Sequence, residues 1–369
     1  MNFGIKKSLL ALAVLGAFAG AASAQTSVTM YGVLDAGVSI QQPSATNSAA
    51  GNQTSLQSGI STPSRIGFQG SEDFGGSLRA IFQLEAGLQL NNGDNSTTGT
   101  LFDRASWIGL NGDFGTVMVG RQFTPMYNAV YSIDPFSLGM AGNAGNLMHL
   151  GGANINGNTL VGGNNPALLD GGGSQAQNNS MRYVSQSWNN FSLEFNYGLG
   201  GQAGSTSDGS ETGATINYLN GPVMLLASMD ETNTLNNSKS FKTVLVGGTI
   251  NWTEFGVPLK TNIAYQTNNG SDVINGPSVD STNLLLGVRI PFSAQQEILF
   301  SYIHNDNKAA GMSGDQFALG YTYALSKRTT LYTSIGEIIN KNGADYSLGN
   351  ASNAGYGVRG FDLGMRHAF

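Results

Sequence analysis

The C-terminal residues 360–369 alternate between two kinds of side chain up to the last position of the chain. Phe361, Leu363, Met365, His367 and Phe369 fall on one face, and Asp362, Gly364, Arg366 and Ala368 fall on the other. Successive side chains of a β-strand point to opposite faces, so a period of two predicts a strand rather than a frayed tail. The chain is therefore expected to end inside a sheet.

The first residues have the features of an export signal. Lys6 and Lys7 are basic, an apolar run covers residues 9–19, and residues 22–24 (Ala-Ser-Ala) form a small-residue cleavage site. The apolar run is shorter than the ~20 residues that a membrane-spanning helix requires, and no stop-transfer pattern follows it. Residues 1–24 are therefore predicted to be a signal peptide.

The mature chain is expected to begin at Gln25 and to form one domain, residues 25–369. No apolar run in it approaches the length of a spanning helix. A β-barrel does not need one, because only every second residue of its strands faces lipid. An export signal together with a C-terminal alternating strand favours a barrel in the outer membrane of a Gram-negative bacterium.

Composition excludes several classes of protein. The chain has no cysteine, so it forms no disulfides, and its 52 glycines and 11% charged residues suit neither a disordered chain nor a packed helical one. Removing the charges of Lys6 and Lys7 changes the net charge from −6 to −8. An acidic chain without a basic stripe argues against a nucleic-acid partner.

Alternation recurs along the whole chain and defines sixteen expected strands. They cover residues 28–40, 62–70, 78–90, 103–112, 115–121, 179–186, 191–198, 212–220, 222–230, 242–252, 257–267, 281–290, 295–304, 315–325, 329–339 and 356–369. A soluble sandwich would also alternate, but these rows reach the ~9–11 residues of a tilted membrane strand, against ~5–6 in soluble sheets.

Connections between the expected strands alternate in length. Tight turns at 111–114, 220–222 and 325–327 contrast with Gly/Asn/Ser-rich loops such as 41–61 and 122–178. An even number of strands with short periplasmic turns and long external loops is typical of an outer-membrane barrel. The prediction is an all-β, sixteen-stranded antiparallel transmembrane barrel in which strand 356–369 pairs with strand 28–40, leaving no open edge.

Aromatic residues gather at the short-turn end of the expected barrel, where amphipathic rings prefer the membrane–water interface. They are Phe74, Phe114, Trp188, Trp252, Phe255 and Phe292.

Residues 122–178 form the longest connection, and loops of this length usually carry a function. The segment has no Lys or Arg, and its ionisable residues are Asp134, His149 and Asp170. A sixteen-stranded barrel is wide enough to hold water, and an irregular loop is tolerated where it lines water. We therefore expect this third external loop to fold inward and to narrow the pore.

Arginines near the loop-side ends of early strands are candidates for the opposite wall of that constriction. Arg65, Arg104 and Arg182 are the main ones, and Arg79 and Arg121 are weaker ones. A lipid-facing Arg at mid-bilayer costs about 2–4 kcal/mol, so these side chains should point inward. Opposite an acidic loop residue they would set a transverse field, because pores select by charge and radius. The alternative is that they only satisfy hydrogen bonds of the wall.

Four motifs carry a family resemblance. They are SRIGFQGSEDFG at 64–75, LRAIFQLE at 78–85, RASWIGL at 104–110 and GTVMVGRQ at 115–122. Together with the signal peptide and the terminal Phe369, they resemble the general porins of Gram-negative bacteria in their betaproteobacterial branch. The resemblance covers essentially the whole chain.

This resemblance implies a homotrimer of sixteen-stranded barrels that passes ions and small hydrophilic solutes by diffusion. It implies a third loop inside the pore with Arg65, Arg104 and Arg182 opposite, and Asp134 as the candidate acidic partner. It also implies contact with outer-membrane lipid and lipopolysaccharide, and with the barrel-assembly machinery through a C-terminal signal that ends in Phe369.

Two departures from the family pattern concern the loop. Many relatives carry a Pro-Glu-Phe-Gly-like tip where residues 134–137 here read Asp-Pro-Phe-Ser, and residues 141–173 add a Gly/Asn-rich extension. Arginines at the constriction favour anions, whereas acidic loops favour cations at the mouth, so the sequence leaves ion selectivity open.

Other functions leave weaker traces. The G-x-G-x-x-A pattern at 198–203 precedes a loop instead of the helix that a dinucleotide site requires, and the three histidines lack metal-ligand spacing. No catalytic residue, metal or cofactor is expected. A solute-specific channel remains an alternative to a general one, and a barrel enzyme or an adhesin fits less well.

Overall fold

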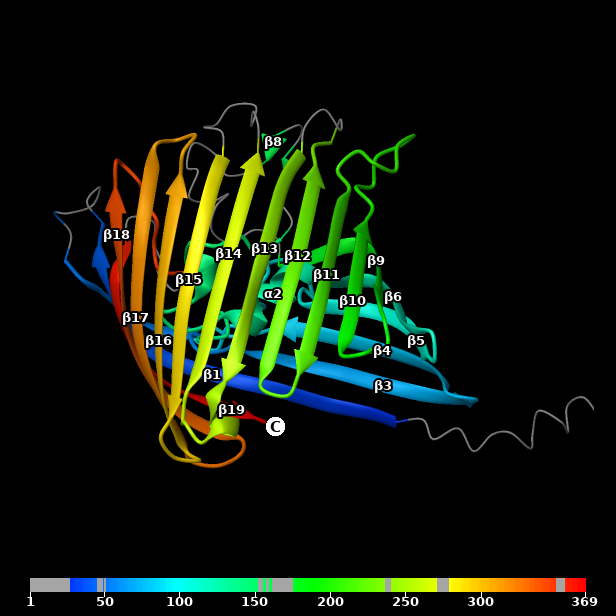
Figure 1. Cartoon of the computed structure of the whole chain (residues 1–369), viewed down its shortest axis with the longest axis horizontal. Coiled ribbons are helices and arrows are strands. Elements are labelled where there is room, and N and C mark those ends of the chain that lie inside the picture. The colour runs from blue at the N-terminus through cyan, green and yellow to red at the C-terminus, as the bar shows by residue number, and fades with distance from the viewer. Residues whose placement is uncertain are drawn as a thin grey trace, which may run out of the picture.

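The computed structural model describes residues 27–44, 49, 51–151, 155–156, 159–160, 175–235, 240–270, 279–349 and 356–369. Its main element is a single antiparallel sheet of 17 strands that closes on itself (Figure 1). The expected signal peptide, residues 1–24, lies outside the described residues and stays a prediction. No helix in the described part of the chain is long and apolar enough to cross a membrane.

The strands follow one another around the wall. They are β1 (Ser27–Pro43), β2 (Gln53–Ser58), β3 (Arg65–Gly75), β4 (Leu78–Gly87), β5 (Ala105–Gly112), β6 (Gly115–Phe123), β9 (Ala176–Val184), β10 (Phe191–Gly198), β11 (Glu211–Asn220), β12 (Val223–Asn233), β13 (Ser240–Asn251), β14 (Lys260–Gly270), β15 (Val279–Pro291), β16 (Gln296–Asn307), β17 (Met312–Ala324), β18 (Thr329–Lys341) and β19 (Tyr356–Ala368).

One strand was not expected from the sequence. β2 lies within the predicted loop 41–61 and pairs with the loop-side half of β1, while β3 pairs with the turn-side half. Because β2 and β3 occupy one place beside β1, the described wall has sixteen places, as predicted. The segment Gln53–Ser58 (QTSLQS) holds a single large apolar residue, Leu56, so its alternation was too weak to indicate a strand.

Barrel closure joins the two ends of the chain. β19 pairs with β1 from Val33 opposite Ala368 to Ile40 opposite Phe361. The last residue continues the ladder, since the Phe369 N–H donates to the Gly32 carbonyl at 3.1 Å and the Gly32 N–H donates back at 3.2 Å. The predicted C-terminal strand and its pairing are therefore confirmed.

Alternation places large apolar side chains on the outside of the wall. Along β19, Phe361, Leu363 and Met365 are exposed, whereas the intervening Asp362 is fully buried on the inner face. The turn-side aromatics are exposed as well: Phe74, Phe114, Trp188, Phe255 and Phe292. Such an outer surface would be unstable in water and suits contact with lipid.

The interior holds the first part of the long connection after β6. It contains the helix α2 (Pro125–Ile133) and a short 3-10 helix, η2 (Ala144–Asn146), and Figure 1 shows α2 enclosed by the strands. A second 3-10 helix, η3 (Trp252–Phe255), follows β13, and β7 (Ile155–Asn156) pairs with β8 (Thr159–Leu160). Most of the remaining Gly/Asn-rich extension, including Asp170, lies outside the described residues.

Candidate pore constriction

A carboxylate of the barrel wall lies between two of the expected arginines. Glu85, on the inner face of β4, is 2.7 Å from Arg104 (Oε1 to Nε) and 3.3 Å from Arg65 (Oε2 to Nε). The Tyr31 hydroxyl donates to Glu85 Oε2 at 2.8 Å. The Glu85 side chain is only 6% exposed, so a buried carboxylate is compensated by two guanidinium groups and a hydroxyl.

The same network extends toward the turn side. Gln83 donates to the Tyr31 hydroxyl at 2.6 Å, and the Trp107 indole N–H donates to Gln83 Oε1 at 3.1 Å. These side chains come from β1, β4 and β5, so neighbouring strands hold one another's polar groups in place. The wall around Arg65 and Arg104 is therefore preorganised by hydrogen bonds.

The third arginine has a separate carboxylate. Arg182 of β9 lies 2.7 Å from Glu194 of β10, and Asn128 of α2 donates to the same Glu194 oxygen at 3.2 Å. Arg104 lies over the Phe123 ring at 5.2 Å, and that ring stacks on Tyr127 at 4.7 Å. The structure thus brings Arg65, Arg104 and Arg182 to the side of the barrel where α2 begins.

Arg121 and Arg79 lie elsewhere. Arg121 follows the outward-facing Val119 and donates to the carbonyls of Asp103 at 2.6 Å and Ala176 at 3.2 Å, which ties two loop-side segments together. Arg79 sits beside the short turn and pairs with Asp73 at 3.4 Å. Arg79 is eight residues along β4 from Gly87, the residue opposite Arg65, and this separation corresponds to roughly 26 Å of strand.

Asp134 is also placed differently from the expectation. Its carboxylate accepts the backbone N–H groups of Phe136 at 2.9 Å, Leu138 at 2.8 Å and Ala144 at 3.0 Å, and the residue is 2% exposed. Burial raises the pKa of Asp134 to about 6, although these three N–H groups act to lower it. The residue holds the turn after α2 together and is not brought to the arginines.

Polar side chains of the opposite wall bind the loop backbone. Asn262 of β14 donates to the Ile133 carbonyl at 2.8 Å, and the Gln266 amide exchanges hydrogen bonds of 2.8 and 2.9 Å with His149. Further along, the Ala141 N–H donates to Ser334 of β18 at 3.2 Å. These bonds satisfy backbone groups that an irregular buried segment would otherwise leave unpaired.

Inward-facing glycines allow the loop to approach the wall closely. A Cβ at Gly287 of β15 would lie 2.7 Å from Pro135, and one at Gly320 of β17 would lie 2.7 Å from Phe136. A Cβ at Gly336 of β18 would meet Ala141 at 2.8 Å. Three successive contacts thus depend on positions without a side chain, because a β-carbon there would displace the loop.

A polar cavity of about 420 Å³ remains between the loop and the wall on the turn side. Pro135, Phe136 and Ser137 of the loop line it together with Arg65. The other charged residues in its lining are Arg289, Glu297 and Arg366. Arg289 pairs with Glu297 at 2.5 Å, which leaves this part of the lumen with more cationic than anionic groups.

The pattern of residues 11–357 matches the family model described as Gram-negative porin. The chain belongs to this family. Outer membrane porin protein 32 of Delftia acidovorans is 32% identical over 99% of this chain and 100% of its own length. An outer membrane porin protein of Bordetella pertussis is 30% identical over 89% of this chain and 93% of its own length.

Solved porin structures share the fold. The anion-selective porin from Comamonas acidovorans has a TM-score of 0.77 at 26% identity and covers 94% of this chain and 100% of its own. The trimer form of OmpT from Vibrio cholerae has a TM-score of 0.64 at 14% identity, which speaks for the fold alone, and covers 93% of this chain and 99% of its own.

Family membership settles the general function. The protein is an outer-membrane porin of a Gram-negative bacterium, with a closed sixteen-stranded antiparallel barrel, and it is a channel rather than an enzyme. Among the described residues, no group of three or more His, Asp or Glu could hold a metal ion.

Sequence reasoning missed the porin's wall carboxylates. Alternation places Glu85 and Glu194 on the polar faces of their strands, but their pairing with the arginines depends on the register between strands. Gly67 and Ala105 both lie opposite Glu85, so Arg65 is a diagonal neighbour of this carboxylate and Arg104 immediately precedes its other partner. A register assignment from the hairpin turns could have identified this group.

Proposed function

We propose that this outer-membrane porin passes small hydrophilic solutes through a constriction lined by Arg65, Arg104 and Arg182, and that it prefers small anions. Selective passage requires no bond to form or break, since the permeation rates of solutes depend on the pore radius and on the electrostatic potential at its narrowest part. The loop residues 125–150 reduce the cross-section, and the arginine-bearing wall sets the potential.

The balance of charges at two places on the inner wall carries the proposal, beside α2 and around the turn-side cavity. Other inward carboxylates, such as Asp35 and Asp362, are buried and do not line that cavity. Beside α2, three arginines face two carboxylates, Glu85 and Glu194. On the turn side, Lys260, Arg289 and Arg366 point inward near a single carboxylate, Glu297. An excess of fixed positive charge in a water-filled channel raises the local concentration of anions.

The net negative charge of the chain would favour cations, but the total charge does not govern permeation. Much of the acidic excess lies on turns and outer surfaces, for example Asp73, Glu254 and Glu337. Charges farther from the channel than a Debye length, about 8 Å at physiological salt, are largely screened. The few charges at the constriction therefore count most.

The experiment is a reversal-potential measurement in planar lipid bilayers under a KCl gradient, with the refolded protein. We expect stepwise conductance with chloride more permeant than potassium, and a shift toward potassium in Arg104→Gln and Arg65→Gln. Arg328→Gln, in a short turn, is the matched control. A reversal potential that both constriction variants leave unchanged would overturn the proposed constriction.

We further propose the assembly that the family implies. The porin works as a homotrimer in contact with outer-membrane lipid and lipopolysaccharide, after export through a cleaved signal peptide, residues 1–24. The barrel-assembly machinery would recognise the C-terminal strand that ends in Phe369. The long apolar rows on the outer face support membrane and subunit contacts, and cross-linking of native membranes tests the trimer.

A further inference from the structure

Three aromatic rings form a column inside the barrel, beside the arginine wall. Phe123, Tyr127 and Tyr131 are four residues apart, a spacing that places Tyr127 and Tyr131 on one face of α2. The Phe123 and Tyr127 rings stack with their centroids 4.7 Å apart, and the Tyr127 and Tyr131 rings with their centroids 6.3 Å apart. Because Arg104 lies over the Phe123 ring at 5.2 Å, the column starts at the proposed constriction.

The other end of the column is open. Tyr127 is 8% exposed, whereas Tyr131 is 47% exposed and lines the turn-side cavity of about 420 Å³. Lipid contact does not explain this exposed ring, because α2 is enclosed by the strands (Figure 1). The cavity is within the ~300–1,000 Å³ typical of ligand sites, and an aromatic ring offers a surface on which a second ring can pack.

Arg366, on the inner face of β19, brings a cation without a carboxylate partner to the same cavity. Its Nε is buried without a hydrogen-bond partner, and the residue forms no ion pair within the described part of the chain. Asp35 lies directly opposite Arg366 in the β1–β19 ladder. The Asp35 carboxylate instead accepts from the Tyr332 hydroxyl at 2.6 Å and from the Thr62 N–H at 3.0 Å.

The two other guanidinium groups of the lining are already engaged. Arg65 contacts Glu85 at 3.3 Å, and two nitrogens of Arg289 contact the Glu297 oxygens at 2.9 and 2.5 Å. A carboxylate that enters the cavity would therefore gain most at Arg366, where it does not compete with a carboxylate of the protein.

We propose that the turn-side cavity binds aromatic monocarboxylates, for which benzoate is the simplest probe, with the ring against Tyr131 and the carboxylate at Arg366. A guanidinium can donate two parallel hydrogen bonds to a carboxylate, and a planar ring packs on an exposed tyrosine. Pro135 and Leu299 add apolar surface to the same lining. The inference rests on the proposed function in one respect, namely that an anionic solute enters this pore.

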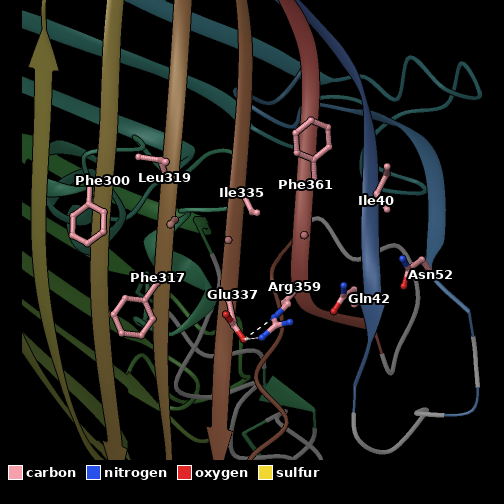
Figure 2. A pocket seen from close by; sticks show the side chains of 13 residues that line it. Ile40, Gln42, Asn52, Phe300, Phe317, Leu319, Ile335, Glu337, Arg359 and Phe361 are labelled. Atoms are coloured by element: carbon pink, nitrogen blue, oxygen red, sulfur yellow. Dashed lines mark hydrogen bonds and ion pairs between the residues drawn. The ribbon is translucent and has the colours of Figure 1, made fainter.

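A groove on the outer wall also combines aromatic side chains with an arginine. Figure 2 shows Phe300, Phe317 and Phe361 on its surface and the ion pair of Arg359 with Glu337 at one end. The guanidinium of this groove is already paired, and the groove lies outside the channel. A solute bound there would not obstruct the flow of ions, so a block of the current reports on the lumen alone.

The test measures the block of the chloride current through wild-type channels in planar bilayers at neutral pH. Benzoate is compared with cyclohexanecarboxylate, which has the same charge and a similar size but no aromatic ring. We expect benzoate to reach half-block at a concentration about two- to tenfold lower, the range that stacking on one aromatic side chain gives.

Two variants separate the ring from the charge. Tyr131→Leu should remove the preference for benzoate, whereas Tyr131→Phe, which keeps the ring, should retain it. Arg366→Gln should weaken the block by both carboxylates about fivefold, the effect of one charge at contact distance in water. Tyr265→Leu is the matched control, because Tyr265 is 46% exposed on the outer face of β14 and should leave the preference for benzoate in place.

Equal block of the wild type by the two carboxylates, or no block by either, would overturn the inference. So would a preference for benzoate that persists in Tyr131→Leu. Heat-modifiable migration on gels shows whether each variant is folded, and the comparison of the two carboxylates on the wild type requires no variant. The reversal potential of the same channels under a KCl gradient tests the proposed function separately, because both probes carry the same charge.

Discussion

At the scale of single residues, the proposed constriction predicts that the charges beside Arg65 and Arg104 set the potential in the pore, and Glu85 provides the sharpest test. Glu85→Gln removes the negative charge between Arg65 and Arg104 and keeps most of the side chain. One charge about 5 Å from a permeating ion in water-like surroundings changes its relative permeability about two- to fourfold. We therefore expect a stronger chloride preference in the reversal potential.

Glu254→Gln is the matched control for this change. It removes one carboxylate from a short turn at the edge of the barrel and should leave the reversal potential as it is in the wild type. If Glu85→Gln and Glu254→Gln behave alike, Glu85 does not set the potential at the constriction.

Asp134 should make the loop sensitive to pH. Its pKa of about 6 in the folded protein lies above the ordinary value of 3.8, so folding favours the protonated form. Protonation of Asp134 therefore stabilises the folded state on the order of 3 kcal/mol. This contribution is fully present below about pH 4 and is lost as pH rises through about 6. We expect current noise from loop motion to increase between pH 4 and pH 7.

Asp134→Asn is the companion variant. It cannot ionise, so its current noise should not change over the same pH range. It also replaces one acceptor oxygen by an N–H₂ group that faces backbone donors, so its loop should be noisier than the wild type at pH 4. A pH dependence that persists in Asp134→Asn would assign the effect to another group.

At the scale of elements, the packing of the inward-folded loop against β15, β17 and β18 depends on glycines in these strands, which the alternating pattern does not explain. Gly320→Val places a branched side chain where Phe136 packs, and overpacking of this kind costs typically about 1–3 kcal/mol. We expect the loop tip to move away from β17, with a larger single-channel conductance and a lower melting temperature. Gly51→Val, at a position with open space around it, should change neither.

Most strands of the wall could be predicted from the sequence, because lipid outside and polar groups inside impose a strict period of two. β10, from Phe191 to Gly198, was predicted to the residue, and the other main strands differ by a few residues at their ends. β2 was missed because two of its three outward positions, Thr54 and Ser58, are polar. At the loop-side rim, β2 is held in an extended conformation by its pairing with β1, and its side-chain pattern does not indicate this conformation.

The candidate site was only partly predictable, for a related reason. An inward arginine can be inferred from the cost of exposing it to lipid, and the side chains of Arg65, Arg104 and Arg182 do lie inside the barrel wall. Their role in permeation stays a prediction. The path of the loop depends on contacts between residues far apart in the chain, such as Asn146 with Gln316. No local pattern contains that information, so Asp134 was expected to face the pore although it bonds to its own loop.

At the scale of the whole molecule, the last residue stabilises the closure of the barrel. Removing Phe369 loses two backbone hydrogen bonds to Gly32 and the ring that covers this glycine. We expect the truncated protein to lose its heat-resistant compact band on gels at a lower temperature than the wild type, and to accumulate less in the outer membrane. His367→Ser, which keeps the terminus, should retain the compact band; an unchanged truncation would contradict this role.

The pairing of β1 with β19 also dictates an order of events in the life of the chain. β1 is synthesised before the other strands and β19 after them, but the two are neighbours in the finished wall. β1 therefore cannot pair with β19 until the whole chain has been made. No part of the cylinder can be sealed while synthesis or translocation continues. The whole polypeptide must therefore cross the periplasm with its apolar rows unsatisfied, and escorting proteins have to protect it until its final residue arrives.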